Sequence, residues 1–157
     1  LHLLSRRQRQ MCIRDSDETE ACGCGRKGCL EQYASATGLV RLAKRYFEKN
    51  TKNSILTGKE ITAKEVFDAA KAGDAAALEI TEEFGAYLGQ ALVNLAATVD
   101  PAVFVIGGGV SKAGDILLET VRKYFYDHAF YGNQKTKITL ATLGNDAGIY
   151  GAAKQVL

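Results

Sequence analysis

The chain has 157 residues, of which 46% are hydrophobic and 24% are charged, so it can bury a core and is not a disordered chain. No apolar run approaches the ~18–20 residues of a membrane span, which excludes an integral membrane protein. The net charge of +2 comes from residues 1–16, because the rest of the chain holds 16 basic and 17 acidic residues. That balance offers no basic patch, so we predict no nucleic-acid and no membrane partner.

The first 16 residues, LHLLSRRQRQMCIRDS, show neither a helical period nor caps. Their arginines are compatible with a basic arm or a transit peptide, whereas Leu3 and Leu4 are too short an apolar stretch for a signal peptide. A third interpretation is that this head is not native, because RRQRQMCIRDS resembles translated sequence from the ends of assembled reading frames. We favour this third interpretation and leave residues 1–16 out of the fold prediction.

Residues 17–29 are polar and rich in glycine and cysteine, which predicts a loop. Cys22, Cys24 and Cys29 lie within eight residues of one another, and three thiolates at this spacing can converge on one Zn²⁺. With no even disulfide framework, we predict a reducing, cytoplasmic compartment and a metal site that needs a fourth ligand. Three uncoordinated thiols are the simpler alternative. Glu31 follows closely, and its position alone indicates only a favourable charge in a first helical turn.

Helical periodicity begins at Gly38, where apolar residues recur at the spacing of one helix face. These residues are Leu39, Leu42, Ala43, Tyr46 and Phe47. A linker over residues 50–58 separates this helix from a shorter one, for which Thr62 and Glu65 form a capping box and Gly73 marks the end.

A third helix is predicted from Asp74, which can cap it, to about Val99, before the helix-breaking Asp100-Pro101 pair. Gly85 and Gly89 lie four residues apart within this helix, although a glycine in a helix interior costs roughly 1 kcal/mol relative to alanine. We therefore expect a neighbouring element to approach the helix closely at these two positions.

The last third of the chain alternates strands and helices. Residues 103–106 form a short, continuous apolar run, which is typical of a strand buried on both faces of a sheet. A glycine run ends this strand, and an amphipathic helix with Ile116, Leu117, Val121 and Phe125 follows it. A second strand over residues 138–142 and a final helix over 148–156 complete an α/β pattern.

Gly107, Gly108 and Gly109 lie at the carboxyl end of the first strand, where a turn without side chains lets the backbone approach a ligand. The start of the following helix would favour phosphate, although an ordinary tight turn explains such a run equally well. A third motif, LGNDAG at residues 143–148, leads into the last helix, which Asn145 or Asp146 could cap.

The three motifs are more specific together than apart. C-x-C-G-x-x-G-C-x-E, an apolar strand ending in I-G-G-G-V, and L-G-N-D-A-G, in this order, resemble the repressor, open reading frame, kinase (ROK) family. Over residues 17–157 the chain is similar to the bacterial glucokinases of that family. The resemblance implies an actin-like (ribonuclease-H-like) ATPase fold, in which residues 17–157 would form the C-terminal lobe with its zinc loop.

The resemblance also implies roles for individual residues. Cys22, Cys24 and Cys29 would be ligands of a structural zinc ion, and Glu31 would bind sugar hydroxyl groups. Residues 107–109 would lie beside the adenosine of ATP, which carries Mg²⁺. The implied reaction is phosphorylation of a hexose, most simply glucose at its 6-hydroxyl, by an intact parent protein that forms a homodimer.

The chain departs from the family pattern where catalysis is concerned. The phosphate-binding D-x-G-G-T loop is absent, and so is the Asn-Asp pair whose aspartate is the catalytic base, so we expect no catalytic residue in this chain. The E-x-G-H stretch, which supplies a zinc-ligand histidine and a sugar contact, does not precede Cys22. His2 and His128 are wrongly placed to replace that histidine, and Cys12 could do so only by accident.

Two other functions stay open at this point. A sugar-responsive repressor of the same family would carry a DNA-binding helix-turn-helix upstream, and a stand-alone zinc-loop module would serve only to bind partners. Sugar-dependent ATP turnover by the intact parent distinguishes the kinase from both. The motifs leave open which hexose is used and whether ATP or polyphosphate is the donor.

Overall fold

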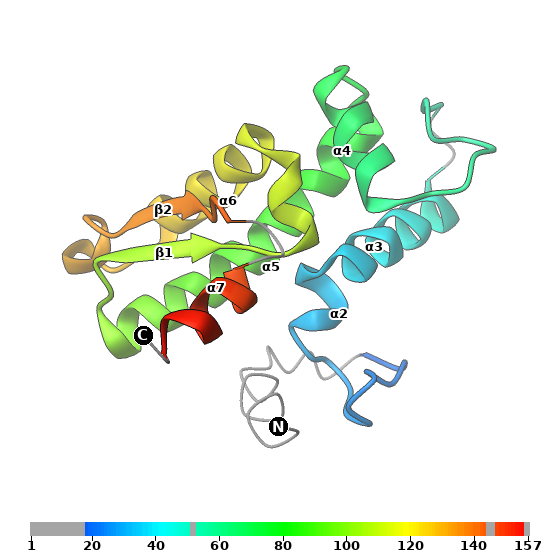
Figure 1. Cartoon of the computed structure of the whole chain (residues 1–157). Helices are drawn as coiled ribbons and strands as arrows, with labels where there is room; N and C mark the ends of the chain where they lie inside the picture. Colours follow the sequence, from blue (N-terminus) through cyan, green and yellow to red (C-terminus); the bar gives the residue numbers. More distant parts are fainter. Residues whose placement is uncertain (1–17, 51–52, 144–146, 156–157) are drawn as a thin grey trace.

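A computed structural model describes residues 18–50, 53–143 and 147–155. The elements in chain order are α2 (Glu31–Ala34), α3 (Ala36–Lys49), α4 (Ala63–Lys71), α5 (Ala75–Val99), β1 (Val103–Ile106), a 3₁₀ helix (Gly109–Ala113), α6 (Asp115–His128), a second 3₁₀ helix (Tyr131–Asn133), β2 (Lys137–Leu140) and α7 (Ala147–Lys154). The long helix α5 connects two groups of elements (Figure 1). It packs against α6 beside the sheet, and also against α2, α3 and α4.

The sheet of the described residues consists of β1 and β2, which run parallel with Val103 opposite Lys137 and Ile106 opposite Leu140. Helix α6 connects the two strands and covers one face of the sheet, where the rings of Phe104 and Phe125 meet edge to face at 6.0 Å. This strand–helix–strand unit confirms the predicted α/β pattern. The second strand begins one residue earlier and ends two residues earlier than predicted.

The prediction that the first strand is buried on both faces was wrong for this chain. Ile106 is buried and Phe104 is half-buried, but Val103 and Val105 are 45% and 60% exposed. The side chains of a strand alternate between its two faces, and α6 covers only the face that carries Phe104 and Ile106. The apolar run therefore predicted the strand correctly, but it did not show that only one face of the sheet is covered.

The predicted helix boundaries are largely confirmed because their caps form. Thr62 accepts a hydrogen bond from the Glu65 amide at 3.3 Å, and the Glu65 carboxylate accepts one from the Thr62 amide at 2.9 Å. Asp74 caps α5 by accepting the Ala77 amide at 2.9 Å. Helix α3 begins two residues before the predicted start, because Ser35 caps it.

The close approach expected at Gly85 and Gly89 is confirmed. A Cβ atom placed on Gly85 would lie 2.7 Å from the Cβ of Thr120, and one on Gly89 would lie 2.9 Å from the ring of Tyr124. Both contacts come from α6. The two glycines therefore let α5 and α6 pack more closely than any side chain there would permit.

The amphipathic helix predicted after the glycine run is confirmed, but it does not follow the run directly. The 3₁₀ helix Gly109–Ala113 comes first, and α6 starts at Asp115 after Gly114, whose φ of +74° turns the chain. The final helix spans 147–154 rather than 148–156. The head over residues 1–16 and the proposed caps Asn145 and Asp146 lie outside the described residues. Among the described helices, none combines the length and apolar composition needed to cross a membrane.

Candidate functional site

The structure brings the three motif cysteines together. The sulfur atoms of Cys22, Cys24 and Cys29 all lie within 4.8 Å of one another, and those of Cys24 and Cys29 are 3.4 Å apart. The loop turns back on itself because the Gly25 amide donates to the Cys22 carbonyl at 2.7 Å, and the Cys22 amide donates to the Arg26 carbonyl at 2.6 Å. Gly25 has a φ of +81°, which a residue with a side chain rarely adopts.

This donor set fits a zinc ion. Zinc sites prefer thiolates at about 2.3 Å in a tetrahedron, which places ligand sulfurs roughly 3.8 Å from one another. Cys22 and Cys29 are buried and Cys24 is half-buried. Burial raises the pKa of the Cys22 thiol, so a bound cation would be needed to favour its thiolate at neutral pH. Three converging soft donors are the larger part of the ligand set of a structural zinc site.

Glu31 lies directly beside this cluster. It is the first residue of α2, and its carboxylate oxygen Oε2 accepts a hydrogen bond from the Cys22 thiol at 3.6 Å. Only Leu30 separates it from Cys29 in the chain. The predicted sugar ligand and the predicted metal ligands therefore form one local unit, and the conformation of the cysteine loop determines where the Glu31 carboxylate lies.

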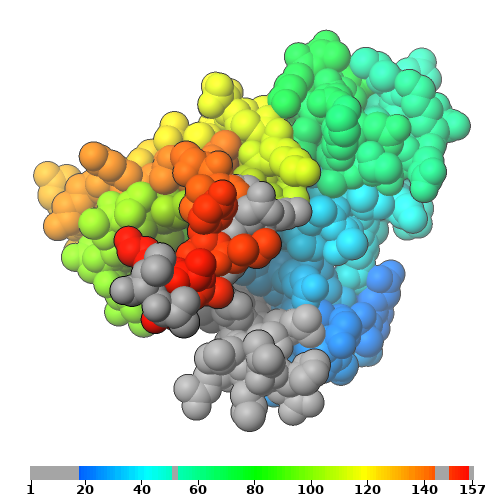
Figure 2. All heavy atoms as spheres, in the orientation of Figure 1, coloured from blue at the N-terminus to red at the C-terminus, as the bar shows by residue number. Residues whose placement is uncertain are grey.

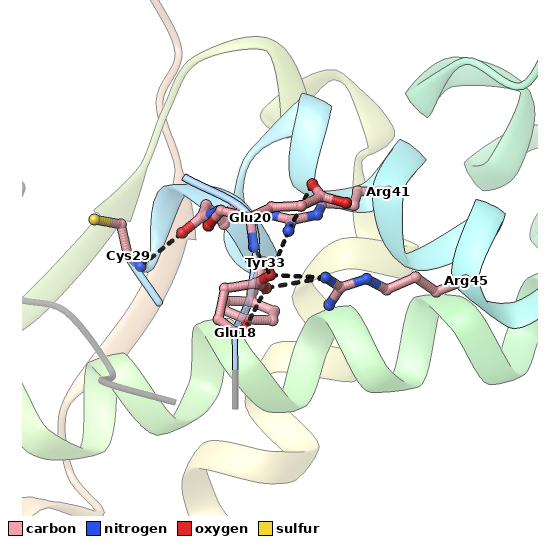
Figure 3. A network of polar contacts seen from close by, with 7 residues as sticks. Glu18, Glu20, Cys29, Tyr33, Arg41 and Arg45 are labelled. Atoms are coloured by element: carbon pink, nitrogen blue, oxygen red, sulfur yellow. Dashed lines mark hydrogen bonds and ion pairs between the residues drawn. The ribbon is translucent and has the colours of Figure 1, made fainter. Parts of the chain in front are cut away.

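The buried carboxylate of Glu18, which the sequence analysis did not identify, holds the N-terminal end of this loop in place. The side chain of Glu18 has no exposed surface and accepts hydrogen bonds from Arg41 at 2.6 Å, Tyr33 at 2.7 Å and Arg45 at 2.8 Å. It also accepts the Glu20 amide at 2.9 Å. Figure 3 shows the two arginines reaching from α3 towards Glu18. We call Glu18, Tyr33, Arg41 and Arg45 the Glu18 clamp.

The Glu18 clamp holds its central carboxylate ionised. Burial alone would raise the pKa of Glu18, but the hydrogen bonds from Arg45 and Tyr33 and the charge of Arg41 outweigh it and lower the pKa to about 2. Sequence reasoning missed this group because its partners lie 15 to 27 residues away. The one available signal was the spacing of Arg41 and Arg45, four residues apart and so on one face of α3.

A second set of hydrogen bonds ties both ends of the cysteine loop to α2. The Cys29 amide donates to the side-chain oxygen of Gln32 at 3.1 Å, and the Gln32 side-chain amide donates to the Glu20 carbonyl at 3.1 Å. Residues 18–30 consequently lie against α2 and α3 at the surface of the molecule (Figure 2). The loop is thus held by protein contacts on either side of the cysteines.

The glycine run lies near the same helices. Gly108 has a φ of +81° and its carbonyl accepts the Ser111 hydroxyl at 2.7 Å. A Cβ atom on Gly109 would lie 4.0 Å from the Cβ of Ala36, the first residue of α3. Gly107 directly follows β1, and a Cβ atom on it would lie 3.5 Å from the Cβ of Ala141, which follows β2. The turn predicted to meet a nucleotide is therefore next to the helix that follows the predicted sugar ligand.

Comparisons with known proteins assign these features to one family. The sequence model of the ROK family matches residues 5–157. A glucokinase from Halalkalibacterium halodurans is 43% identical over 135 residues, covering 83% of this chain and 41% of the relative. An N-acetyl-D-glucosamine kinase from Vibrio cholerae is 33% identical over 132 residues, covering 84% of this chain and 40% of the relative.

A solved structure with the same fold is the ROK family glucokinase from Streptomyces griseus in complex with glucose and AMPPNP. It is 36% identical, with a TM-score of 0.79, and the match covers 92% of this chain and 49% of that one. The chain therefore spans less than half the length of these relatives.

Proposed function

The chain belongs to the ROK family, and we propose that it is the C-terminal lobe of an ATP-dependent hexose kinase that acts on glucose. Its similarity to relatives named glucokinase supports the reaction, and its similarity to an N-acetyl-D-glucosamine kinase makes the choice of sugar the point to test. The observation that carries the proposal is the position of Glu31, next to the cysteine cluster and at the start of the helix pair that also borders the glycine turn.

Cys22, Cys24 and Cys29 would hold a structural zinc ion. When bound, the ion would cross-link the loop and neutralise the charge of its thiolates, without taking part in the reaction. The fourth ligand would come from outside residues 18–50, 53–143 and 147–155. The loop contacts of Gln32 and the Glu18 clamp would leave only the short segment between Cys22 and Cys29 for the metal to order.

Glu31 would orient the sugar. An ionised carboxylate accepts hydrogen bonds from two neighbouring hydroxyl groups of a pyranose, and such charge-assisted bonds fix the ring more firmly than neutral ones. Glu31 begins α2 two residues after Cys29, so a loop ordered by the ion would fix the position of the Glu31 backbone. The role is binding and orientation, so we assign no proton transfer to Glu31.

Gly107, Gly108 and Gly109 would form one wall of the adenosine pocket. A backbone without side chains lets the nucleotide lie directly on the turn, and a substituent at Gly108 would be strained whatever the space around it. The remaining requirements of phosphoryl transfer are a base for the sugar hydroxyl and groups that hold Mg²⁺ and the γ-phosphate. We place both in the part of the parent protein that this chain does not contain.

A fusion protein tests the proposal. The N-terminal half of the Halalkalibacterium halodurans glucokinase, joined to residues 17–157, should form ADP in the presence of glucose. Glu31→Gln should raise the glucose KM about tenfold or more while leaving the ATP KM nearly unchanged, because hydrogen bonds to a charged group are worth about 1.5–3 kcal/mol. Glu60→Gln, which changes an exposed glutamate before α4, is the matched control.

Each outcome identifies the part of the proposal at fault. Faster turnover with N-acetylglucosamine than with glucose would overturn the choice of sugar alone, and turnover with polyphosphate instead of ATP would overturn the donor. An equal effect of Glu31→Gln and Glu60→Gln on the glucose KM would show that Glu31 does not bind the sugar. Sugar binding without any turnover would favour the repressor over the kinase.

A further inference from the structure

We propose that Cys24 and Cys29 are a site of reversible oxidation, at which a hydroperoxide converts the two thiols into a disulfide. The first observation is the short distance between two sulfurs of the cluster. Those of Cys24 and Cys29 are 3.4 Å apart, and the Cys22 thiol, which also contacts both of them, lies 3.6 Å from the Glu31 carboxylate. A disulfide bond is about 2.05 Å long, so the sulfurs of Cys24 and Cys29 need to close by only about 1.4 Å.

The loop between the two cysteines can make that movement. A Cβ atom placed on Gly25 would meet nothing within 4 Å, and both Gly25 and Gly28 have positive φ angles. Cys29 is the fixed partner, because its amide is held by Gln32 at 3.1 Å while its sulfur points away from the polar network (Figure 3). The half-buried Cys24 is therefore the side chain that moves.

The different exposure of Cys24 and Cys29 also determines the order of the two oxidation steps. Oxidation of thiols starts at an accessible sulfur that has a second thiol nearby. The sulfur of Cys24 attacks one oxygen of hydrogen peroxide, the O–O bond breaks, and water leaves with the thiol proton, giving a sulfenic acid. The sulfur of the buried Cys29 then attacks the Cys24 sulfur and displaces the sulfenic oxygen as a second water. Two thiols are thus oxidised and one peroxide is reduced to two waters.

The disulfide would compete with metal binding. It removes two of the three sulfur donors, and a zinc ion left with Cys22 alone would be lost. This consequence rests on the zinc site proposed above, whereas the disulfide itself does not. Because Glu31 contacts Cys22, loss of the ion would also alter the surroundings of the proposed sugar ligand, so the modification would act on sugar binding.

Peptide mapping of the whole 157-residue chain tests the pairing directly. Trypsin cleaves after Arg26 and Lys27, which separates Cys24 from Cys29 but leaves Cys22 and Cys24 in one peptide. After treatment with hydrogen peroxide, alkylation and digestion, mass spectrometry should find peptide 15–26 joined to peptide 28–41, with Cys22 alkylated. Cys22→Ser should retain this cross-link, and Cys29→Ser should abolish it.

Other products would overturn the assignment. These are a Cys22–Cys24 disulfide within peptide 15–26, a link from Cys29 to Cys22 or to Cys12, or sulfinic acids without a cross-link. A parallel measurement on the zinc-loaded chain, with a chromogenic chelator, should detect one zinc released per cross-link and rebound after reduction with dithiothreitol. A chain that forms the cross-link but never binds zinc would support the oxidation site and overturn the metal site. Zinc retained while the cross-link forms would show that the disulfide does not compete with metal binding.

Discussion

At the scale of single residues, the chain combines groups that the sequence reveals with one that it conceals. The sugar-binding role of Glu31 is implied only by the family resemblance, but the convergence of Cys22, Cys24 and Cys29 was predictable from their short spacing. Glu18 was not, because a buried carboxylate is recognised by its partners, and these come from α2 and α3. A glutamate four residues before a cysteine carries no local signal of burial.

The Glu18 clamp makes a prediction about stability and pH. The pKa of Glu18 is lowered from 4.5 to about 2 on folding, so its contribution to the free energy of unfolding is present above pH 4.5 and is lost as the pH falls towards 2. A shift of this size corresponds to about 3 kcal/mol. Glu18→Gln should therefore lower the free energy of unfolding at pH 7 by roughly that amount, measured by urea denaturation of the whole chain.

Glu20→Gln is the matched control for this prediction. Glu20 also pairs with Arg41, at 2.7 Å, but 64% of its side chain is exposed, and exposed ion pairs contribute about 1 kcal/mol or less. The difference between the two variants should shrink as the pH falls from 4.5 to 2. A difference that stays constant over this interval would mean that Glu18 stabilises the chain by packing rather than by its charge.

At the scale of elements, α5 and α6 pack so closely at Gly85 and Gly89 that no side chain fits between them. Gly85→Ala should lower the free energy of unfolding by about 1–3 kcal/mol, because the new Cβ would overlap the backbone and Cβ of Thr120. Gly89→Ala should also be destabilising, since its new Cβ would lie 2.9 Å from Cδ1 and 3.0 Å from Cβ of Tyr124, whose ring is stacked on His128. Thermal denaturation monitored by circular dichroism measures both.

For Gly151→Ala we expect the opposite effect, an increase in stability. Gly151 lies in α7 with nothing within 4 Å of an added Cβ, so alanine should stabilise this helix by up to about 1 kcal/mol. If Gly85→Ala raised the melting temperature as Gly151→Ala does, the close packing of α5 on α6 would be refuted. The close contact of α5 with α6 was predictable from the sequence, because two glycines in an otherwise apolar helix destabilise it unless a neighbouring element packs against them.

The cysteine loop makes a prediction about metal removal. The whole chain should bind one zinc ion, and a chelator should increase hydrogen exchange in residues 22–29 while leaving α5 protected, because the energy of a structural metal is coupled to local folding. Cys24→Ser should abolish binding of the ion, and Cys12→Ser, outside the motif, should not. Metal analysis showing no zinc, or a loss of zinc in Cys12→Ser alone, would contradict this assignment of ligands.

Local signals predicted the elements better than their surroundings. The capping box of Thr62 and Glu65 requires only residues within one turn, so the start of α4 followed from the sequence. The burial of β1 depends on which elements cover each face of the sheet, and an apolar run in the sequence does not contain that information. Val103 and Val105 are therefore exposed in a strand whose composition is that of a sheet interior.

At the scale of the whole molecule, the described residues expose apolar side chains in several places. Val103 and Val105 lie on the uncovered face of β1, and Ile149 and Tyr150 of α7 are 71% and 61% exposed. The chain also spans less than half the length of its relatives. Exposed apolar surface of this kind is typical of a face that another part of a protein covers. Fold class was predictable from the order of elements, whereas this surface became visible only in three dimensions.

The last prediction concerns the chain by itself. Residues 1–157 alone should show no glucose-dependent ATP turnover and should bind ATP weakly, because the groups that position the γ-phosphate and accept the hydroxyl proton are proposed to lie in the other lobe. The exposed apolar face should also make the chain associate, which light scattering would detect, and joining the N-terminal lobe should reduce that association and restore turnover. Contaminating hexokinase is controlled for with Glu31→Gln, since turnover by a contaminant would be the same in both preparations. Turnover by the isolated chain that Glu31→Gln abolishes would show that the catalytic base lies within these 157 residues.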